Sequence, residues 1–252
     1  MSKDINANEA KEMNVTEHLS ELRNRLIVTA IMFIVLFIVA FIYHKQIYRF
    51  FEKDMPFQLA VTSLGEIIWI YFTLAGVVAL AGTIPVLSLQ LWLFIKPGLT
   101  KRERRASLMY IPVIFLLFLG GLIFGYFMFI KLILPFLLSL NDGMFTEIFT
   151  VGNYFRFVFK VSLPFALFFE VPIIAMFLTQ LGILTPAFMK KIRKYAYFIM
   201  VIIGAAVTPP DFLLQIVVAV PLIILYEISI YLSHFVYRKK IAKHEAFMEE
   251  TN

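Results

Sequence analysis

Residues 92–105 read WLFIKPGLTKRERR, and within them a long apolar run ends where five cationic side chains arrive together. These cations are Lys96, Lys101, Arg102, Arg104 and Arg105. A short loop this basic is held on the cytoplasmic side during membrane insertion, so this stretch predicts the sidedness of the whole chain. One carboxylate, Glu103, stands among the cations, and we interpret it as a substrate-binding residue. The alternative is that Glu103 neutralises its neighbours on a solvated turn.

The composition indicates an integral membrane protein. Of the 252 residues, 61% are hydrophobic and the mean hydropathy is +0.85, whereas soluble domains are roughly 45–50% apolar. There are no cysteines and the four histidines are scattered, so we expect no disulfide, no thiolate, no metal site and no cofactor. Motifs of hydrolases, metalloproteases and nucleotide-binding proteins are missing, so we expect no enzyme.

The apolar runs predict an all-α, polytopic fold with six transmembrane helices, in a single transmembrane domain over residues 1–252. The expected spans are 27–43, 66–95, 107–140, 154–181, 195–207 and 212–236. The polar segment 1–25 ends in leucines at spacings of three and four, which favours an amphipathic helix that runs into the first span. At 13 residues the fifth span covers about 20 Å, less than the roughly 30 Å hydrocarbon core. The sixth, with Pro221 inside it, is expected to be short as well.

The distribution of Lys and Arg predicts that both termini are cytoplasmic. The segment 1–25, the loops after the second and fourth spans, and the charged tail 237–252 together hold 17 of the 23 cations, and the opposite loops hold three. Six spans satisfy this positive-inside bias, which also explains the net charge of +6 without nucleic acid. Arg156 and Lys160 begin the fourth span near its outer end.

Glu170 is the clearest charge at membrane depth, where an ionised side chain costs at least a few kcal/mol unless it is paired, hydrated or functional. Two residues later, Pro172 cannot donate the backbone hydrogen bond that would satisfy a carbonyl one turn earlier. An acid beside irregular backbone is typical of a site that binds something inside the bilayer. The alternative is a protonated Glu170 that bonds to a neighbouring helix of the same chain.

The turn before the last span, TPPD at residues 208–211, is expected to be tight, because neither Pro209 nor the proline after it can continue a helix. Gln215 lies one turn after Asp211, so Asp211 can cap the last helix while Gln215 bonds inward. Glu227 can pair with a loop cation. A GxxxG pattern in the third span favours close helix packing.

Five segments, in chain order, resemble signature elements of one family. They are 18–26 (HLSELRNRL), 94–105 (FIKPGLTKRERR), 169–172 (FEVP), 208–215 (TPPDFLLQ) and 225–229 (LYEIS). The family is TatC, the multispanning core of the twin-arginine protein translocase, whose elements read HLxELRxRL, FxxPGLxxxERR, FExP, TPPDxxxQ and LYExS. One departure is that Ser63 is followed by Leu64, where the family usually has Ser-Pro before the glutamate that opens the second span.

The resemblance implies a curved, cup-like bundle in the plasma membrane of a bacterium, which helps to export folded precursor proteins that carry twin-arginine signal peptides, driven by the proton gradient. It places Glu21 and Glu103 at the cytoplasmic surface as the residues that bind the arginines, with Arg23, Arg105 and Pro97 at the same site. A guanidinium binds a carboxylate through two parallel hydrogen bonds, and a lysine ammonium cannot. Two carboxylates would therefore select paired arginines, and the neighbouring arginines would keep the acids ionised.

The resemblance also implies partners within the bilayer. Glu170 would face the concave side of the bundle and meet a polar residue of a single-span TatA-type protein, with Gln215 as a second intramembrane polar group. Many copies of that partner would be recruited to form most of the opening. TatB-type proteins and further copies of this chain are expected in the same complex.

A different class stays open, a proton-coupled secondary transporter with Glu170 as its proton site, because such carriers combine broken helices with a buried acid. Against it, no repeat relates residues 1–126 to 127–252, and Glu21 and Glu103 would have no role. A structural membrane scaffold is a third interpretation.

Overall fold

The computed structural model describes residues 15–52, 59–99, 104, 107–140 and 148–251, and the side chains of residues 19–242 within those ranges. Glu103 and Arg105, two of the expected site residues, lie outside the described residues. The elements in chain order are α1 (Val15–Ile42), α2 (His44–Glu52), α3 (Leu64–Ile95), the 3-10 turn η1 (Lys96–Gly98), α5 (Tyr110–Met128), the π-helical turn η2 (Phe129–Ile133), α6 (Leu134–Ser139), α7 (Val151–Phe169), α8 (Val171–Leu181), α9 (Pro186–Lys191), α10 (Arg193–Val207) and α11 (Phe212–Thr251).

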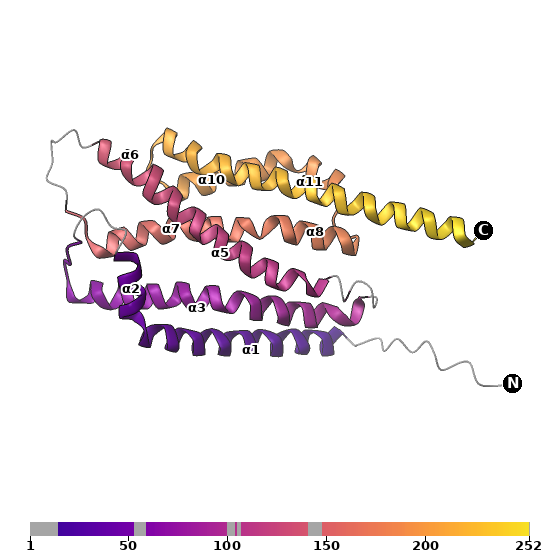
Figure 1. Cartoon of the computed structure of the whole chain (residues 1–252), viewed down its shortest axis with the longest axis horizontal. Helices are drawn as coiled ribbons and strands as arrows, with labels where there is room; N and C mark the ends of the chain where they lie inside the picture. The colour runs from indigo at the N-terminus through magenta and orange to yellow at the C-terminus, as the bar shows by residue number, and fades with distance from the viewer. Residues whose placement is uncertain (1–14, 53–58, 100–103, 105–106, 141–147, 252) are drawn as a thin grey trace.

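The first two long helices lie side by side along the long axis of the molecule (Figure 1). The predicted amphipathic segment and the first span form one helix, α1, as expected. In α3, Gly82 faces the Leu36 side chain, and a Cβ at this glycine would lie 3.1 Å from Leu36 Cδ1. The start of α1 and the end of α11 lie at the same end of the bundle as the η1 turn, and α2 and α6 lie at the other end (Figure 1).

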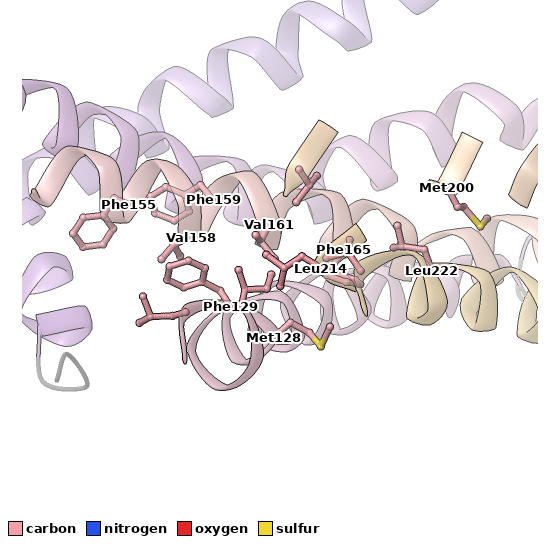
Figure 2. Close-up of a cluster of buried hydrophobic side chains, with 14 of the residues drawn as sticks. Met128, Phe129, Phe155, Val158, Phe159, Val161, Phe165, Met200, Leu214 and Leu222 are labelled. Atoms are coloured by element: carbon pink, nitrogen blue, oxygen red, sulfur yellow. The ribbon is translucent and has the colours of Figure 1, made fainter. Parts of the chain in front are cut away.

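The core is built around α7, against which α5 crosses obliquely. Figure 2 shows Phe155, Phe159 and Phe165 of α7 among the buried side chains. The crossing is close because Gly121 and Gly125 of α5 lie against the backbone of α7, at Ala166 and Ser162. The prediction that the GxxxG pattern serves packing is confirmed.

Five helical segments of the described chain are long and apolar enough to cross a membrane. They are Leu19–Ile42, Leu64–Gly98, Tyr110–Ser139, Val151–Leu181 and Phe212–Ala242. The expected short fifth span corresponds to α10, which has 15 residues and is shorter than these five membrane-crossing segments.

The expectation of a short sixth span is wrong, because α11 is 40 residues long and continues through Pro221. A proline removes one backbone hydrogen bond, and neighbouring helices can compensate for that loss inside a membrane protein. Val218 and Leu222, which flank Pro221, are 1% and 0% exposed. Packing on both sides of the proline therefore holds the helix together.

Asp211 caps α11, as predicted. Its Oδ1 accepts hydrogen bonds from the amides of Leu213 at 2.9 Å and Leu214 at 3.0 Å. Just before it, Pro209 and the following proline turn the chain between α10 and α11, and Gly204 allows the two helices to approach at the Gln215 carbonyl, 3.0 Å from a Cβ built on that glycine.

Removing this cap is expected to destabilise the protein. Asp211→Ala is expected to lower the free energy of unfolding by about 1 kcal/mol, because two amides at the start of α11 lose their acceptor. Asp211→Asn keeps an acceptor oxygen and is expected to stay within about 0.5 kcal/mol of the unsubstituted protein. Thermal unfolding in detergent measures both, and equal midpoints for Ala and Asn would contradict the capping role.

Candidate functional site

Glu21 lies near the start of α1, and this helix starts at the same end of the bundle as the η1 turn (Figure 1). Arg25, one turn later, donates to one Glu21 carboxylate oxygen through Nε at 3.0 Å and again through a terminal nitrogen. The same guanidinium donates to Gln90 Oε1 of α3 at 3.3 Å. Arg23 is exposed to solvent.

A shallow cavity of about 520 Å³ opens beside this pair, and its walls come from α1 and α3. It is lined by Ser20, Glu21, Asn24, Arg25, Val28 and Gln90. Two donors of the Arg25 guanidinium reach one oxygen of this carboxylate, so the site already holds one planar cation. The cavity leaves room for another side chain to reach it.

The turn around Pro97 is tied to both of its flanks. Arg104 Nε donates to the Lys96 carbonyl at 3.0 Å, and the Lys96 ammonium lies 5.4 Å from the centre of the Trp92 ring. Trp92 Nε1 in turn donates to Ser107 Oγ at 2.8 Å. These bonds connect the end of α3 to the residues on the far side of Glu103 in the sequence, so the ends of the basic loop are held in place.

Glu170 lies where the fourth long segment changes from α7 to α8. Its amide turns back to the Leu167 carbonyl at 3.2 Å in a tightened turn, because Pro172 cannot continue the regular pattern. The side chain is 6% exposed, and neither carboxylate oxygen forms a hydrogen bond of ordinary geometry with the described residues. The Phe118 backbone of α5 is a group of the described chain that interacts with this carboxyl, so the alternative of a Glu170 bonded to a neighbouring helix stays open.

Glu170 contributes to the wall of an apolar cavity of about 380 Å³ between α3, α5 and the α7–α8 junction. Most of the other lining residues are apolar, and they include Leu91, Ile114, Leu167 and Ile174. A buried polar group without a partner is costly, so this carboxyl is poised to gain a hydrogen-bond partner from outside the chain.

Two weaker polar residues of the last helix have partners within the chain. Gln215 Nε2 donates to the Val201 carbonyl of α10 at 3.3 Å, which is the inward bond predicted for it. Glu227 accepts from Arg193 at 2.5 Å and from the Tyr197 hydroxyl at 2.5 Å, as expected for a pair with a loop cation. Both residues attach the short α10 to α11.

Sequence reasoning missed Glu66 as a junction between distant segments. Its carboxylate accepts from the Thr62 amide at 2.8 Å, the Thr62 hydroxyl at 2.7 Å and the Gly152 amide at 2.6 Å. Ser63 accepts from the Glu66 amide at 3.3 Å. The spacing Ser63-x-x-Glu66 is that of a capping box, which predicts the bond from the Glu66 amide to Ser63 but neither the bonds to Thr62 nor the bond to α7.

Comparison with known proteins shows the family of this chain. The family profile described as Sec-independent protein translocase protein (TatC) matches residues 17–221. The chain belongs to the TatC family. Sec-independent protein translocase protein TatCd of Bacillus subtilis is 45% identical over 94% of this chain and 98% of its own length, and TatCy of the same organism is 41% identical over 90% and 91%. The crystal structure of a twin-arginine translocase receptor TatC superposes with a TM-score of 0.77 at 35% identity, covering 87% of this chain and 99% of its own.

Membership of the TatC family makes this chain the TatC subunit of a twin-arginine translocase, a multi-pass membrane component of protein transport and not an enzyme. The predicted family is confirmed, and the carrier and scaffold alternatives are set aside. Proteins of the TatC family generally act as receptors for twin-arginine signal peptides. The Glu21–Arg25 ion pair and the cavity beside Glu170 are the two features of the structure to be related to translocation.

Proposed function

We propose that Glu21 and Glu103 bind the two arginines of a signal peptide at the cytoplasmic surface, beside Arg23, Pro97 and Arg105. The observation that carries this proposal is that Glu21 already holds a guanidinium, that of Arg25, through two donors. An incoming arginine takes the place of Arg25 on this carboxylate, and Arg25 keeps its contact with Gln90. A lysine offers one point charge and cannot replace a two-donor bond.

The topology that goes with this function has six spans and both termini in the cytoplasm. It is supported by the positive-inside bias and by the position of the start of α1, the η1 turn and the end of α11 at one end of the bundle. The short α10 crosses as the fifth span at about 22 Å, and the bilayer is locally thinned beside it. The bundle is a single domain whose concave face is open to the membrane of a bacterial cell.

The transmembrane helix of a TatA-type single-span partner packs beside the Glu170 cavity and places one side chain in it, and a TatB-type protein uses the same face. The cavity walls are apolar and hold one carboxyl that forms no hydrogen bond of ordinary geometry with the described residues, which fits an apolar helix that carries one hydrogen-bonding side chain. Several copies of this chain join the complex, and export draws on the proton gradient. Gln215 and the Pro209–Asp211 turn hold α10 and α11 beside that face.

Binding of a labelled twin-arginine peptide to the purified protein tests the recognition step. Glu21→Gln and Glu103→Gln are each expected to weaken binding by roughly tenfold or more, because a hydrogen bond to a charged group contributes about 1.5–3 kcal/mol. A Lys-Lys peptide is expected to bind as weakly as the Arg-Arg peptide binds to these variants. Arg25→Gln is expected to act in the opposite direction and strengthen binding, because it removes the internal competitor.

The control for charge is Lys190→Gln, which removes one exposed cation from another basic loop and is expected to leave binding unchanged. Equal binding of Arg-Arg and Lys-Lys peptides, with no effect of either glutamate substitution, would contradict the proposal. Weaker binding in Arg25→Gln would show that Arg25 positions Glu21 and does not compete with the peptide.

A further inference from the structure

Two cations on the membrane-facing side of α7 are unexplained by the translocase site. Arg156 and Lys160 are exposed, and they are among the few Lys and Arg residues that fall inside the apolar segments. Among the described residues neither forms an ion pair with a carboxylate. Both instead lie near aromatic rings: Arg156 Cζ is 5.2 Å from the centre of the Trp69 ring, and Lys160 Nζ is 6.0 Å from that of Phe157.

The acid to consider as a partner is Glu66, which lines the same polar cavity as Arg156. This cavity of about 360 Å³ lies between the starts of α3 and α7, and Trp69 and Asn153 also line it. The Glu66 carboxylate accepts from two amides and a hydroxyl and forms no ion pair with Arg156 among the described residues. Its charge still offsets that of Arg156 within the cavity, so the charge left for an anionic ligand is that of Lys160, one turn further along the same face of α7.

The depth of these cations matches the headgroup region of a bilayer. The segment Val151–Leu181 has 31 residues, about 46 Å at 1.5 Å per residue, so about 8 Å extends beyond a core of roughly 30 Å at each end. Lys160 lies about 14 Å along α7 from Val151, about 6 Å inside the core edge. A lysine side chain can extend that far along the helix to bring its charge to the interface.

The order of residues along this face matches the order of groups in a phospholipid. Asn153, Arg156 and Lys160 share the face with Leu163 and Leu167, at spacings of three and four. Leu163 is half-buried and Leu167 is 57% exposed. Polar and cationic side chains thus come first from the end of α7, and apolar ones follow toward the middle of the span.

We propose that the face of α7 formed by Asn153, Arg156 and Lys160, together with Trp69 of α3, binds the phosphate of an anionic phospholipid, with an acyl chain along Leu163 and Leu167. In the topology proposed above, this lipid belongs to the outer leaflet. The lipid holds the starts of α3 and α7 together beside the bond between Glu66 and Gly152. The site is separate from Glu21 and from the Glu170 cavity, so it is independent of how the signal peptide binds.

Fluorescence of Trp69 tests this site directly, because the chain has two tryptophans and Trp92→Phe leaves Trp69 alone. This variant is reconstituted in phosphatidylcholine nanodiscs that contain increasing amounts of phosphatidylglycerol, with bromine on the acyl chains of one lipid at a time. Brominated phosphatidylglycerol is expected to quench Trp69 at a roughly fivefold lower mole fraction than brominated phosphatidylcholine, as for a cation at an anionic surface. When Arg156→Gln and Lys160→Gln are added to this variant, the two brominated lipids are expected to quench Trp69 at the same mole fraction.

Arg156 lies over the Trp69 ring and can itself change the fluorescence of Trp69. Comparing the two lipids within each variant cancels this effect. Arg49→Gln is the matched control, because it removes an exposed cation from α2 at the same end of the bundle, and it should keep the preference. Equal quenching by both lipids in the Trp92→Phe protein, or a preference that survives in the double substitution, would overturn the proposal. If millimolar inorganic phosphate abolished the preference for phosphatidylglycerol, the site would be assigned to a soluble anion instead. If a single-span partner protein abolished it, the site would be assigned to an acidic group of that protein.

Discussion

Glu170→Ala is expected to abolish export while signal-peptide binding stays unchanged. The carboxyl lies in an apolar cavity, and neither of its oxygens forms a hydrogen bond of ordinary geometry with the described residues, so in the function proposed above its partner is the single-span protein. Removing one partner of a buried hydrogen bond costs about 1–3 kcal/mol, which weakens the affinity of the single-span partner by roughly fivefold to 150-fold. Export of a twin-arginine precursor in cells and cross-linking to the partner measure the two effects.

The same substitution should not harm the fold, and this separates the role of Glu170 from a structural one. Removing a buried polar group that has no partner relieves a desolvation cost, so the thermal midpoint of Glu170→Ala is expected to equal or exceed that of the unsubstituted protein. Ile174→Ala, which changes the same cavity one turn later, is the matched control and should retain most export. Normal export in Glu170→Ala, or a loss explained by a lower midpoint, would exclude the partner site.

The position of Glu170 was predictable because its signal is local. A single acid within a long apolar run, two residues before a proline, stands out in the sequence, and the structure places it at the α7–α8 junction with little exposure. The absence of a hydrogen bond of ordinary geometry within the described chain was not predictable, because it depends on which side chains of α3 and α5 line the cavity. Local pattern thus identified the residue, whereas its contacts depend on tertiary packing.

Contacts between segments that are far apart in the sequence could not be predicted from the sequence alone. Arg25 and Glu21 are one turn apart and could have been paired from their spacing, but the bond from Arg25 to Gln90 depends on how α1 lies against α3. The bond from Glu66 to Gly152 likewise joins residues 86 apart. The sixth span was expected to be short because a proline interrupts it, although α11 continues through Pro221 with Val218 and Leu222 buried beside it.

Gly121→Val is expected to prevent stable folding, because α5 and α7 touch through their backbones at this glycine. A Cβ at Gly121 would lie 2.5 Å from Ala166 Cα, 2.9 Å from Ala166 N and 2.9 Å from the Phe165 carbonyl oxygen. All three are backbone atoms, so no side-chain rotation relieves the overlap and the helices must separate along the central crossing. Overpacking by a single group costs about 1–3 kcal/mol where neighbours can shift, and a branched side chain against a fixed backbone exceeds that range.

Gly120→Ala provides the comparison within the same helix. A Cβ placed on Gly120 would have no neighbouring atom within 4 Å, and alanine favours a helix over glycine by up to about 1 kcal/mol, so this variant is expected to be as stable as the unsubstituted protein or more so. Gly121→Ala should lie between the two, with a thermal midpoint below that of Gly120→Ala. Protein level in the membrane and the monodispersity of the detergent-purified protein measure the series. If all three variants behaved alike, the α5–α7 crossing could not depend on the direct backbone contact at Gly121, and the helices that line the Glu170 cavity would have to be held in place by other contacts.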